Sequence, residues 1–155
     1  MSPRYALLPA LLLTCFAGGS RSALASGIPE LPSITFLAGH PRESESFAAS
    51  LDEGGRAMLE QNVALLKAYP HPFALAGFTD DRERRGLACE ALAQRRAHGL
   101  YDWLIANGMD PAMLPTVITY DETKPIDDNG TEEGRARNRR VEFQFDPVLL
   151  WGRRY

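Results

Sequence analysis

The stretch GFTDDRERRGLACEALAQRRAHGLYDWLIANGMD, at residues 77–110, joins an apolar segment to a long amphipathic one. Residues 73–78 (FALAGF) are apolar and are flanked by turn-forming and polar residues, which is typical of a short buried strand. Residues 84–107 have the apolar spacing of a helix, and Gly108 follows where a C-terminal cap is expected. The inward stripe of this helix is expected to contain Ala88, Leu92, Leu100, Trp103 and Leu104. The stretch therefore predicts a strand and then a helix, with an acid at their junction and two arginines on the helix.

The sequence on either side continues this alternation of strands and helices. A helix is expected to begin at Ser50 and to close before Pro70, with Ser50 and Glu53 as a capping pair. Asn129 and Glu132 are a second candidate capping pair. The other expected elements are strands at 34–38, 117–120 and 141–145, a helix at 131–139, and loops at 39–49 and 121–130. This βαβαβ-type order predicts an α/β (α+β) two-layer sandwich with a small mixed sheet.

The N-terminal residues have the pattern of a secretory signal. Arg4 precedes an apolar run at residues 6–17, and Ala23 and Ala25 are small residues at the positions that a signal peptidase reads. The run is shorter than the ~20 residues that a membrane-spanning helix needs. A buried N-terminal helix is the alternative, but the run has no polar face. The expected divisions are a signal peptide at 1–25, a linker at 26–33, the folded domain at 34–146 and a tail at 147–155.

Charge and cysteine content narrow the function classes. The net charge is −3, and loss of the signal segment with its arginines makes it more negative, which argues against a general nucleic-acid binder. Cys15 would leave with the signal, and Thr14 before it does not suit a lipidation site. Cys89 would then be the single remaining cysteine, so no internal disulfide is expected. We expect no second apolar segment long enough to span a membrane.

One aspartate and three arginines are candidates for a binding site. Asp80 follows the buried strand, where α/β proteins place ligands, although a turn or cap residue would look the same. Arg96 is expected at the border of the buried helix face, where it needs a partner unless its head reaches water. Arg139 and Arg140 precede the last strand, and cations at a helix C-terminus would also explain them.

The sequence offers no catalytic or metal-binding set. None of the three histidines pairs with Cys89 at a spacing that suggests a metal site or a nucleophile and its base. The acids are scattered, and no glycine-rich phosphate loop precedes a helix. We therefore expect no metal, no cofactor and no enzymatic activity.

Two ordered motifs resemble the OmpA-like peptidoglycan-binding domain, which also occurs in Pal-type and MotB-type proteins. The first is the opening stretch, which is similar to the family's Gly-His-Thr-Asp followed by Asn-x-x-Leu-Ser-x-x-Arg-Ala. The second is YDETKPIDDNGTEEGRARNRRVEF at residues 120–143, which from Gly134 onward follows the family pattern Gly-Arg-x-x-Asn-Arg-Arg-Val-Glu. The resemblance extends over residues 34–145.

The resemblance implies a non-catalytic module that holds the diaminopimelate side chain of peptidoglycan stem peptides. In such a module, Asp80 would meet the ligand's ammonium and Arg96 its carboxylate. The pocket residues that the resemblance implies are Asp80, Arg96, Thr79, Cys89 and Arg139. The chain departs from the family at Phe78, where histidine is usual, at Cys89, where asparagine is usual, and at Ala93, where serine is common.

The resulting hypothesis is a periplasmic peptidoglycan-binding module that anchors or tethers at the cell wall or the outer membrane. The alternative is a scaffold that has lost the ligand and binds an envelope protein, for which the arginines at Arg82, Arg84 and Arg85 are the candidate surface. A hydrolase that uses Cys89 is the third reading, and no base is positioned for it.

Overall fold

The computed structural model describes residues 30–68, 70–83, 86–146 and 148. The expected signal peptide with Cys15, the first part of the linker, Arg84, Arg85 and all of the expected tail except Val148 lie outside the described residues.

Four strands form the sheet of the described domain, in the order β1-β4-β2-β3. Strands β2 and β3 are parallel, and β4 is antiparallel to both β1 and β2, so the sheet is mixed as the sequence predicts. The strands are β1 (Ile34–Thr35), β2 (Ala74–Phe78), β3 (Thr116–Asp121) and β4 (Arg140–Gln144). The first strand is shorter than expected, because beyond Thr35 the pairing reduces to an isolated bridge between Phe36 and Leu51.

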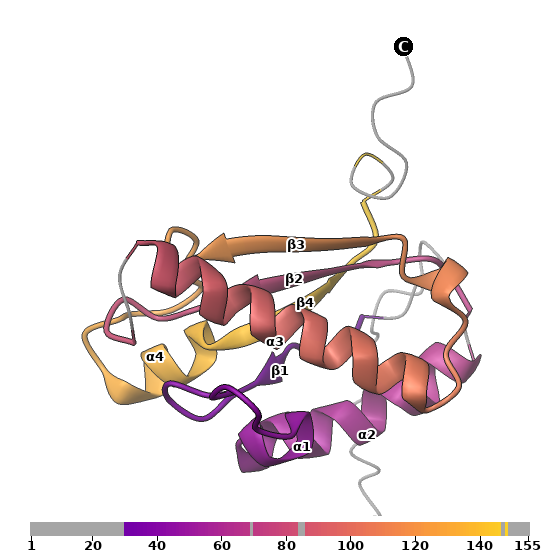
Figure 1. Ribbon diagram of the computed structural model, residues 1–155, viewed down its shortest axis with the longest axis horizontal. Coiled ribbons are helices and arrows are strands. Elements are labelled where there is room, and N and C mark those ends of the chain that lie inside the picture. Colours follow the sequence, from indigo (N-terminus) through magenta and orange to yellow (C-terminus); the bar gives the residue numbers. More distant parts are fainter. Residues whose placement is uncertain (1–29, 69, 84–85, 147, 149–155) are drawn as a thin grey trace, which may run out of the picture.

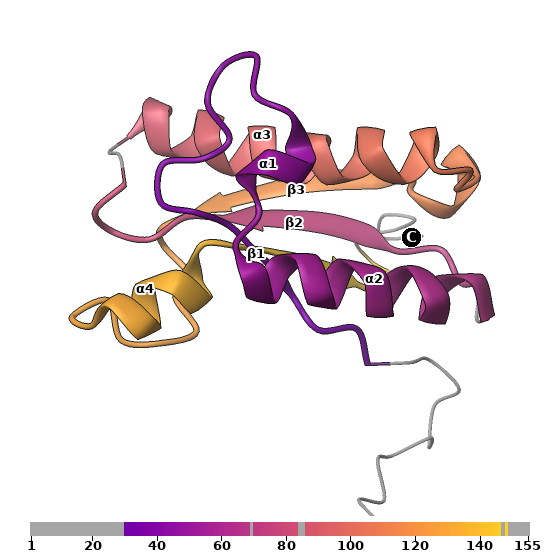
Figure 2. The ribbon, with the colours of Figure 1, turned by 90° about the horizontal axis from the view of Figure 1, so that it is seen from below.

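The helices form the second layer. They are α1 (Phe47–Ser50), α2 (Glu53–Ala68), α3 (Leu87–Ala106), the 3-10 helix η1 (Pro111–Met113) and α4 (Glu132–Asn138). Helix α3 crosses β2 and β3, whereas α2 runs beside β1 at the other edge of the sheet (Figures 1 and 2). Leucines of both helices share one core cluster with Leu75, Val141 and Phe143, so one sheet face carries the core. These features confirm the predicted α/β sandwich.

The central strand β2 is buried along its whole length because β3 and β4 flank it and α3 covers it. Gly77 lies directly under α3, and a Cβ atom at this position would come within 2.1 Å of the carbonyl oxygen of Ala93. The helix approaches closely because its facing residues are small, namely Ala93 and Ala97. This contact fixes how far α3 stands from the end of β2, where the candidate aspartate follows.

Both predicted capping pairs are wrong in their first residue. Asp52, not Ser50, caps the start of α2, and its Oδ1 accepts a hydrogen bond of 2.6 Å from the backbone N–H of Gly55. The Ser50 hydroxyl instead donates to the carbonyl of Phe47 within α1. At α4 the hydroxyl of Thr131, not Asn129, accepts from the backbone N–H of Gly134. Serine, asparagine, aspartate and threonine side chains can all accept a hydrogen bond from a free N–H group of the first helical turn. The spacing of polar residues therefore could not predict which of several neighbours is the N-cap.

The long helix ends where the sequence predicts. Asn107 is its C-cap, and Gly108 has a φ of 89°, a left-handed conformation that side chains other than glycine rarely adopt. Its inward stripe differs at one end: Ala88 is exposed, and Cys89 is buried in its place.

Replacing Gly77 by alanine tests the close approach of α3. The added methyl group meets a backbone oxygen that cannot rotate away, so Gly77→Ala should lower the free energy of unfolding by at least about 3 kcal/mol. Gly54→Ala is the matched control, because its Cβ would make only ordinary contacts of 3.5 Å or more. In helix α2 this control should be neutral or stabilising by up to about 1 kcal/mol. Urea unfolding followed by circular dichroism measures both; equal effects would contradict the packing argument.

Candidate functional site

Asp80 lies directly after β2 and is buried, with 2% of its surface exposed. Its Oδ1 accepts hydrogen bonds from the backbone N–H groups of Arg82 (2.7 Å) and Glu83 (2.9 Å). Its Oδ2 accepts a hydrogen bond of 2.8 Å from Nη1 of Arg139. The aspartate therefore caps the turn after the strand and forms a buried ion pair at the same time.

Arg139 joins three segments of the chain at this point. Its guanidinium donates to Asp80, to Oε1 of Glu132 at 2.8 Å, and to the carbonyl of Phe36 at 3.2 Å. Burial alone would lower the pKa of Arg139, but its hydrogen bonds to the carboxylates of Asp80 and Glu132 raise it above the usual value. The same contact, together with Arg135, lowers the pKa of Glu132. Both shifts favour the charged forms of Arg139 and Glu132.

Asn138 fixes the loop that leads into α4 and so positions Arg139. Its Oδ1 accepts from the backbone N–H groups of Ile126 and Asp127, and its Nδ2 donates to the carbonyl of Asp127 and to Oδ1 of Asn129. A single buried amide thus holds the loop at 126–129 against the end of the helix. This arrangement explains the first two residues of the Asn-Arg-Arg sequence in the second motif: Asn138 holds the loop, and Arg139 pairs with Asp80.

Arg96 is fully buried on the inner face of α3. Its guanidinium forms a two-pronged ion pair with Glu83, at 2.5 Å to Oε1 and 2.8 Å to Oε2. It also donates to the carbonyls of Phe78 and His40, both at 2.9 Å. The expectation that this arginine needs a partner is confirmed, and its charged partner is Glu83.

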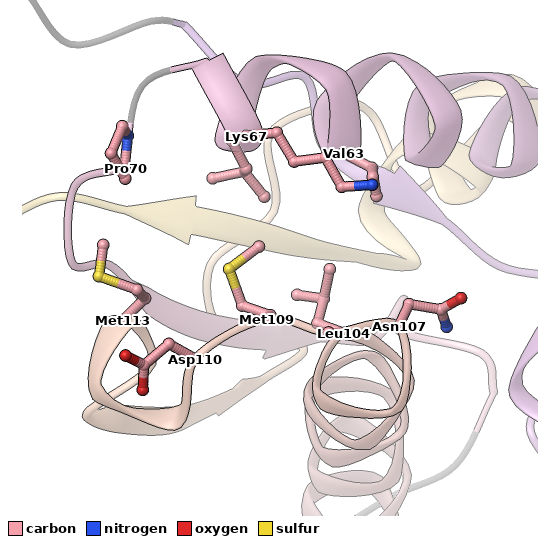
Figure 3. A pocket seen from close by; sticks show the side chains of 10 residues that line it. Val63, Lys67, Pro70, Leu104, Asn107, Met109, Asp110 and Met113 are labelled. Carbon is pink, nitrogen blue, oxygen red and sulfur yellow. The ribbon is translucent and has the colours of Figure 1, made fainter.

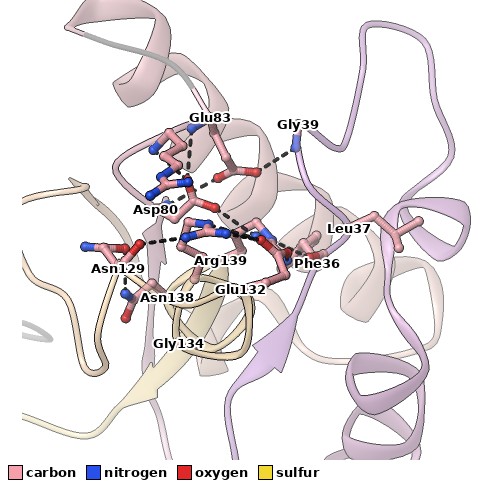
Figure 4. Close-up of polar contacts among 12 residues, drawn as sticks. Phe36, Leu37, Gly39, Asp80, Glu83, Asn129, Glu132, Gly134, Asn138 and Arg139 are labelled. Carbon is pink, nitrogen blue, oxygen red and sulfur yellow. Dashed lines mark hydrogen bonds and ion pairs between the residues drawn. The ribbon is translucent and has the colours of Figure 1, made fainter.

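An open cavity of about 380 Å³ lies beside this cluster. Its wall carries both acids and arginines; it consists of Ala38, Gly39, Asp80, Arg82, Glu83, Glu132, Arg135 and Arg139. Figure 4 shows Asp80, Glu83, Glu132 and Arg139 gathered between the loop after β1 and the start of α4. Arg96 is absent from this wall, because the carboxylate of Glu83 lies between its guanidinium and the cavity.

Thr79 and Cys89 lie together behind the strand end. The Thr79 hydroxyl and the Cys89 sulfur are 2.6 Å apart, and both residues are buried. Neither belongs to the cavity wall, so their role in ligand binding stays a prediction. Arg139 and Asp80 do line the cavity, and the structure brings them into direct contact.

Phe78 lies on the sheet face away from α3. Its ring stacks on Tyr120 with centroids 5.2 Å apart, and the guanidinium of Arg140 sits 3.7 Å from its centroid. Arg140 is itself buried, and this burial lowers its pKa despite a hydrogen bond to Glu142. The ring of Phe78 therefore packs on the outer face of the sheet, whereas its backbone carbonyl accepts a hydrogen bond from Arg96.

Sequence reasoning missed two carboxylates of the site, Glu83 and Glu132. The signal for Glu132 was present, because it lies seven residues before Arg139, two turns along the same helix face. Glu83 had a weaker signal, since it stands in a charged run where every side chain looks exposed. Only the turn after Asp80 brings its side chain into contact with Arg96.

Comparison with known proteins decides the family. The model of the OmpA family matches residues 46–139, which include the first motif, the second motif as far as Arg139, and all charged residues of the cavity wall from Asp80 to Arg139. The chain belongs to the OmpA family.

Relatives of this OmpA-family chain include two curated proteins and a solved structure. The peptidoglycan-associated lipoprotein of Pseudomonas putida is 37% identical over 86 residues, 56% of this chain and 51% of that protein. The peptidoglycan-binding protein ArfA of Mycobacterium tuberculosis is 34% identical over 111 residues, 71% of this chain and 33% of that protein. The chain thus spans about half or less of these curated relatives. The crystal structure of the peptidoglycan-associated lipoprotein from Burkholderia pseudomallei aligns with a TM-score of 0.57 and 25% identity over 74% of this chain and 89% of that one.

A second hollow, of about 280 Å³, opens at the other end of the helical layer. It lies between the C-terminal ends of α2 and α3, and its walls are largely apolar, with Val63, Leu104, Met109 and Met113 facing inward (Figure 3). Within the described residues no three metal-ligating side chains gather in one place. Nor does any described helix have the length and apolarity to cross a membrane.

The thiol of Cys89 provides a test of how tightly the strand end is closed. Burial raises its pKa to about 11. Because only the thiolate reacts, alkylation by iodoacetamide at pH 8 should be at least about 100-fold slower in the folded protein than in urea. The raised pKa also means that the neutral thiol contributes fully to the free energy of unfolding below about pH 9. This contribution is lost as the pH rises toward 11. Peptide mapping by mass spectrometry measures the rate at Cys89; similar rates in both states would contradict the burial.

Proposed function

We propose that this OmpA-family chain is a non-catalytic module that binds peptidoglycan through the diaminopimelate residue of the stem peptide. Asp80 receives the ammonium of the ligand, and Arg96 receives its carboxylate. The observation that supports the proposal is the burial of both side chains near the end of β2, where Asp80 lines an open cavity and Arg96 donates to the carbonyl of Phe78.

The chemistry of the cavity suits a zwitterion. The distal end of diaminopimelate carries one ammonium and one carboxylate, which require an acceptor and a donor held at fixed positions. Asp80 is fixed by two backbone donors and by Arg139, and Arg96 by the carbonyls of Phe78 in β2 and His40 in the loop after β1. A guanidinium fork binds a carboxylate through two parallel hydrogen bonds, and the pair with Glu83 has this geometry already.

The names of the relatives support binding to the cell wall. One is called peptidoglycan-associated and another peptidoglycan-binding, and the structural neighbour belongs to the first kind. We infer a place in the cell envelope, in the periplasm and near the outer membrane, with peptidoglycan as the partner. The expected signal peptide agrees with this location.

One observation favours the alternative of a scaffold that binds an envelope protein. The fork of Arg96 is filled by Glu83, so a ligand carboxylate does not find it empty. Arg82 and Arg135 on the cavity wall could then meet acidic groups of a protein partner. Binding to isolated cell walls separates the two functions.

Single substitutions in the clamp test the proposed function. Asp80→Asn removes the negative charge that meets the ammonium but keeps an oxygen for the backbone donors, and Arg96→Gln removes the fork. Each should weaken binding to purified diaminopimelate-type sacculi by at least about 30-fold, since each loss leaves a charge unpaired in a desolvated site. Co-sedimentation with sacculi measures the affinity.

Arg95→Gln is the matched control, because Arg95 neighbours Arg96 but is only partly buried and contacts the carbonyl of Pro41. It should bind as the parent does, and circular dichroism must show all three variants folded. Lysine-type sacculi, which lack the distal carboxylate, should bind more weakly than the diaminopimelate type. Unchanged binding of folded Asp80→Asn and Arg96→Gln would show that the assigned cavity is wrong.

A further inference from the structure

The carboxylate of Glu83 is bound as a ligand would be. It accepts two hydrogen bonds from Arg96, one of 2.6 Å from the backbone N–H of Gly39 and one of 3.3 Å from that of Asp80. Only 2% of the Glu83 side chain is exposed, although the residue belongs to a charged surface turn. Four donors therefore converge on one carboxylate at the edge of the cavity.

Arg96 and Asp80, which supply three of the four donors, have anchors other than the Glu83 carboxylate. Arg96 is anchored by the carbonyls of Phe78 and His40, and Gly39 belongs to the loop after β1. Asp80 is fixed by Arg139 as well as by its own turn. The donors come from three separate segments, so together they form a carboxylate receptor (Arg96 and the N–H groups of Gly39 and Asp80) that Glu83 fills.

We propose that Glu83 is an internal competitor for this receptor and sets the ligand preference of the site. This role rests on the proposed function, since it concerns the carboxylate of the same bound ligand. A ligand carboxylate must displace Glu83, which is tethered nearby and is present at a high effective concentration. A ligand whose distal carboxylate is amidated does not compete for the receptor.

The competition has a size that can be measured. When a receptor is free in only a fraction of the molecules, the apparent affinity falls by that fraction. A receptor that is free in one molecule in ten therefore weakens binding about tenfold.

Glu83→Ala should bind a diaminopimelate-containing muropeptide at least about tenfold more tightly than the parent. The two should bind the same muropeptide with amidated diaminopimelate equally.

Rescue by acetate tests the receptor without any peptidoglycan. Glu83→Ala leaves the four donors unpaired, so its melting temperature should fall and then rise with added acetate more than with chloride at equal ionic strength. The parent and Glu83→Gln, whose receptor stays filled, should show no such difference. Glu60→Ala, an exposed acid on α2, is the control for general salt effects. If Glu83→Ala does not fold in chloride, its recovery on refolding in acetate gives the same readout.

The outcomes separate this inference from the proposed function. Rescue by acetate together with tighter muropeptide binding supports both. Rescue by acetate with no muropeptide binding by parent or variant supports the filled receptor and refutes the proposed function. No rescue, or a parent that binds diaminopimelate muropeptide as tightly as Glu83→Ala, overturns the role of Glu83.

Discussion

The ion pair between Arg139 and Asp80 holds together the elements that form the site. It joins the end of β2 to the junction of α4 and β4, and the further bond to the Phe36 carbonyl brings in the segment after β1. The backbone contributes as well, since the N–H of Phe36 donates to the carbonyl of Arg139. Two strands and a helix therefore meet at one guanidinium.

Burying such a charged cluster costs free energy of folding. Removing charges from water costs several kcal/mol for each ion, and apolar side chains of similar volume would often stabilise a core better. Arg96, Arg139 and Arg140 are each nearly or fully buried, yet each has oxygen acceptors in place. Stability alone therefore does not explain three buried guanidiniums at one end of a sheet. A need to hold charge at fixed positions would explain them.

The sequence predicted most of the architecture because its signals are local. The buried strand at Ala74–Phe78, the long helix and its glycine cap follow from apolar spacing and backbone preference, which do not depend on distant residues. Asp80 was found because it follows that strand. The short first strand and the capping residues were not, since tertiary pairing and competition among adjacent polar side chains decide them. The pairing of Arg96 with Glu83 also escaped prediction, because Glu83 precedes α3, Arg96 lies well inside that helix, and the turn at Asp80 decides where the Glu83 side chain points.

The contact between Arg96 and Glu83 then follows from the capping by Asp80. Oδ1 of Asp80 takes the N–H groups of Arg82 and Glu83, which curls the chain back over the end of the strand. That curl points the Glu83 side chain at the guanidinium below it, where the N–H groups of Gly39 and Asp80 complete its surroundings. The same aspartate that is proposed to hold an ammonium thus also delivers the carboxylate that fills the neighbouring receptor. A ligand that drew Asp80 toward itself would loosen the turn that carries Glu83, so a single side chain would link the two halves of the proposed clamp.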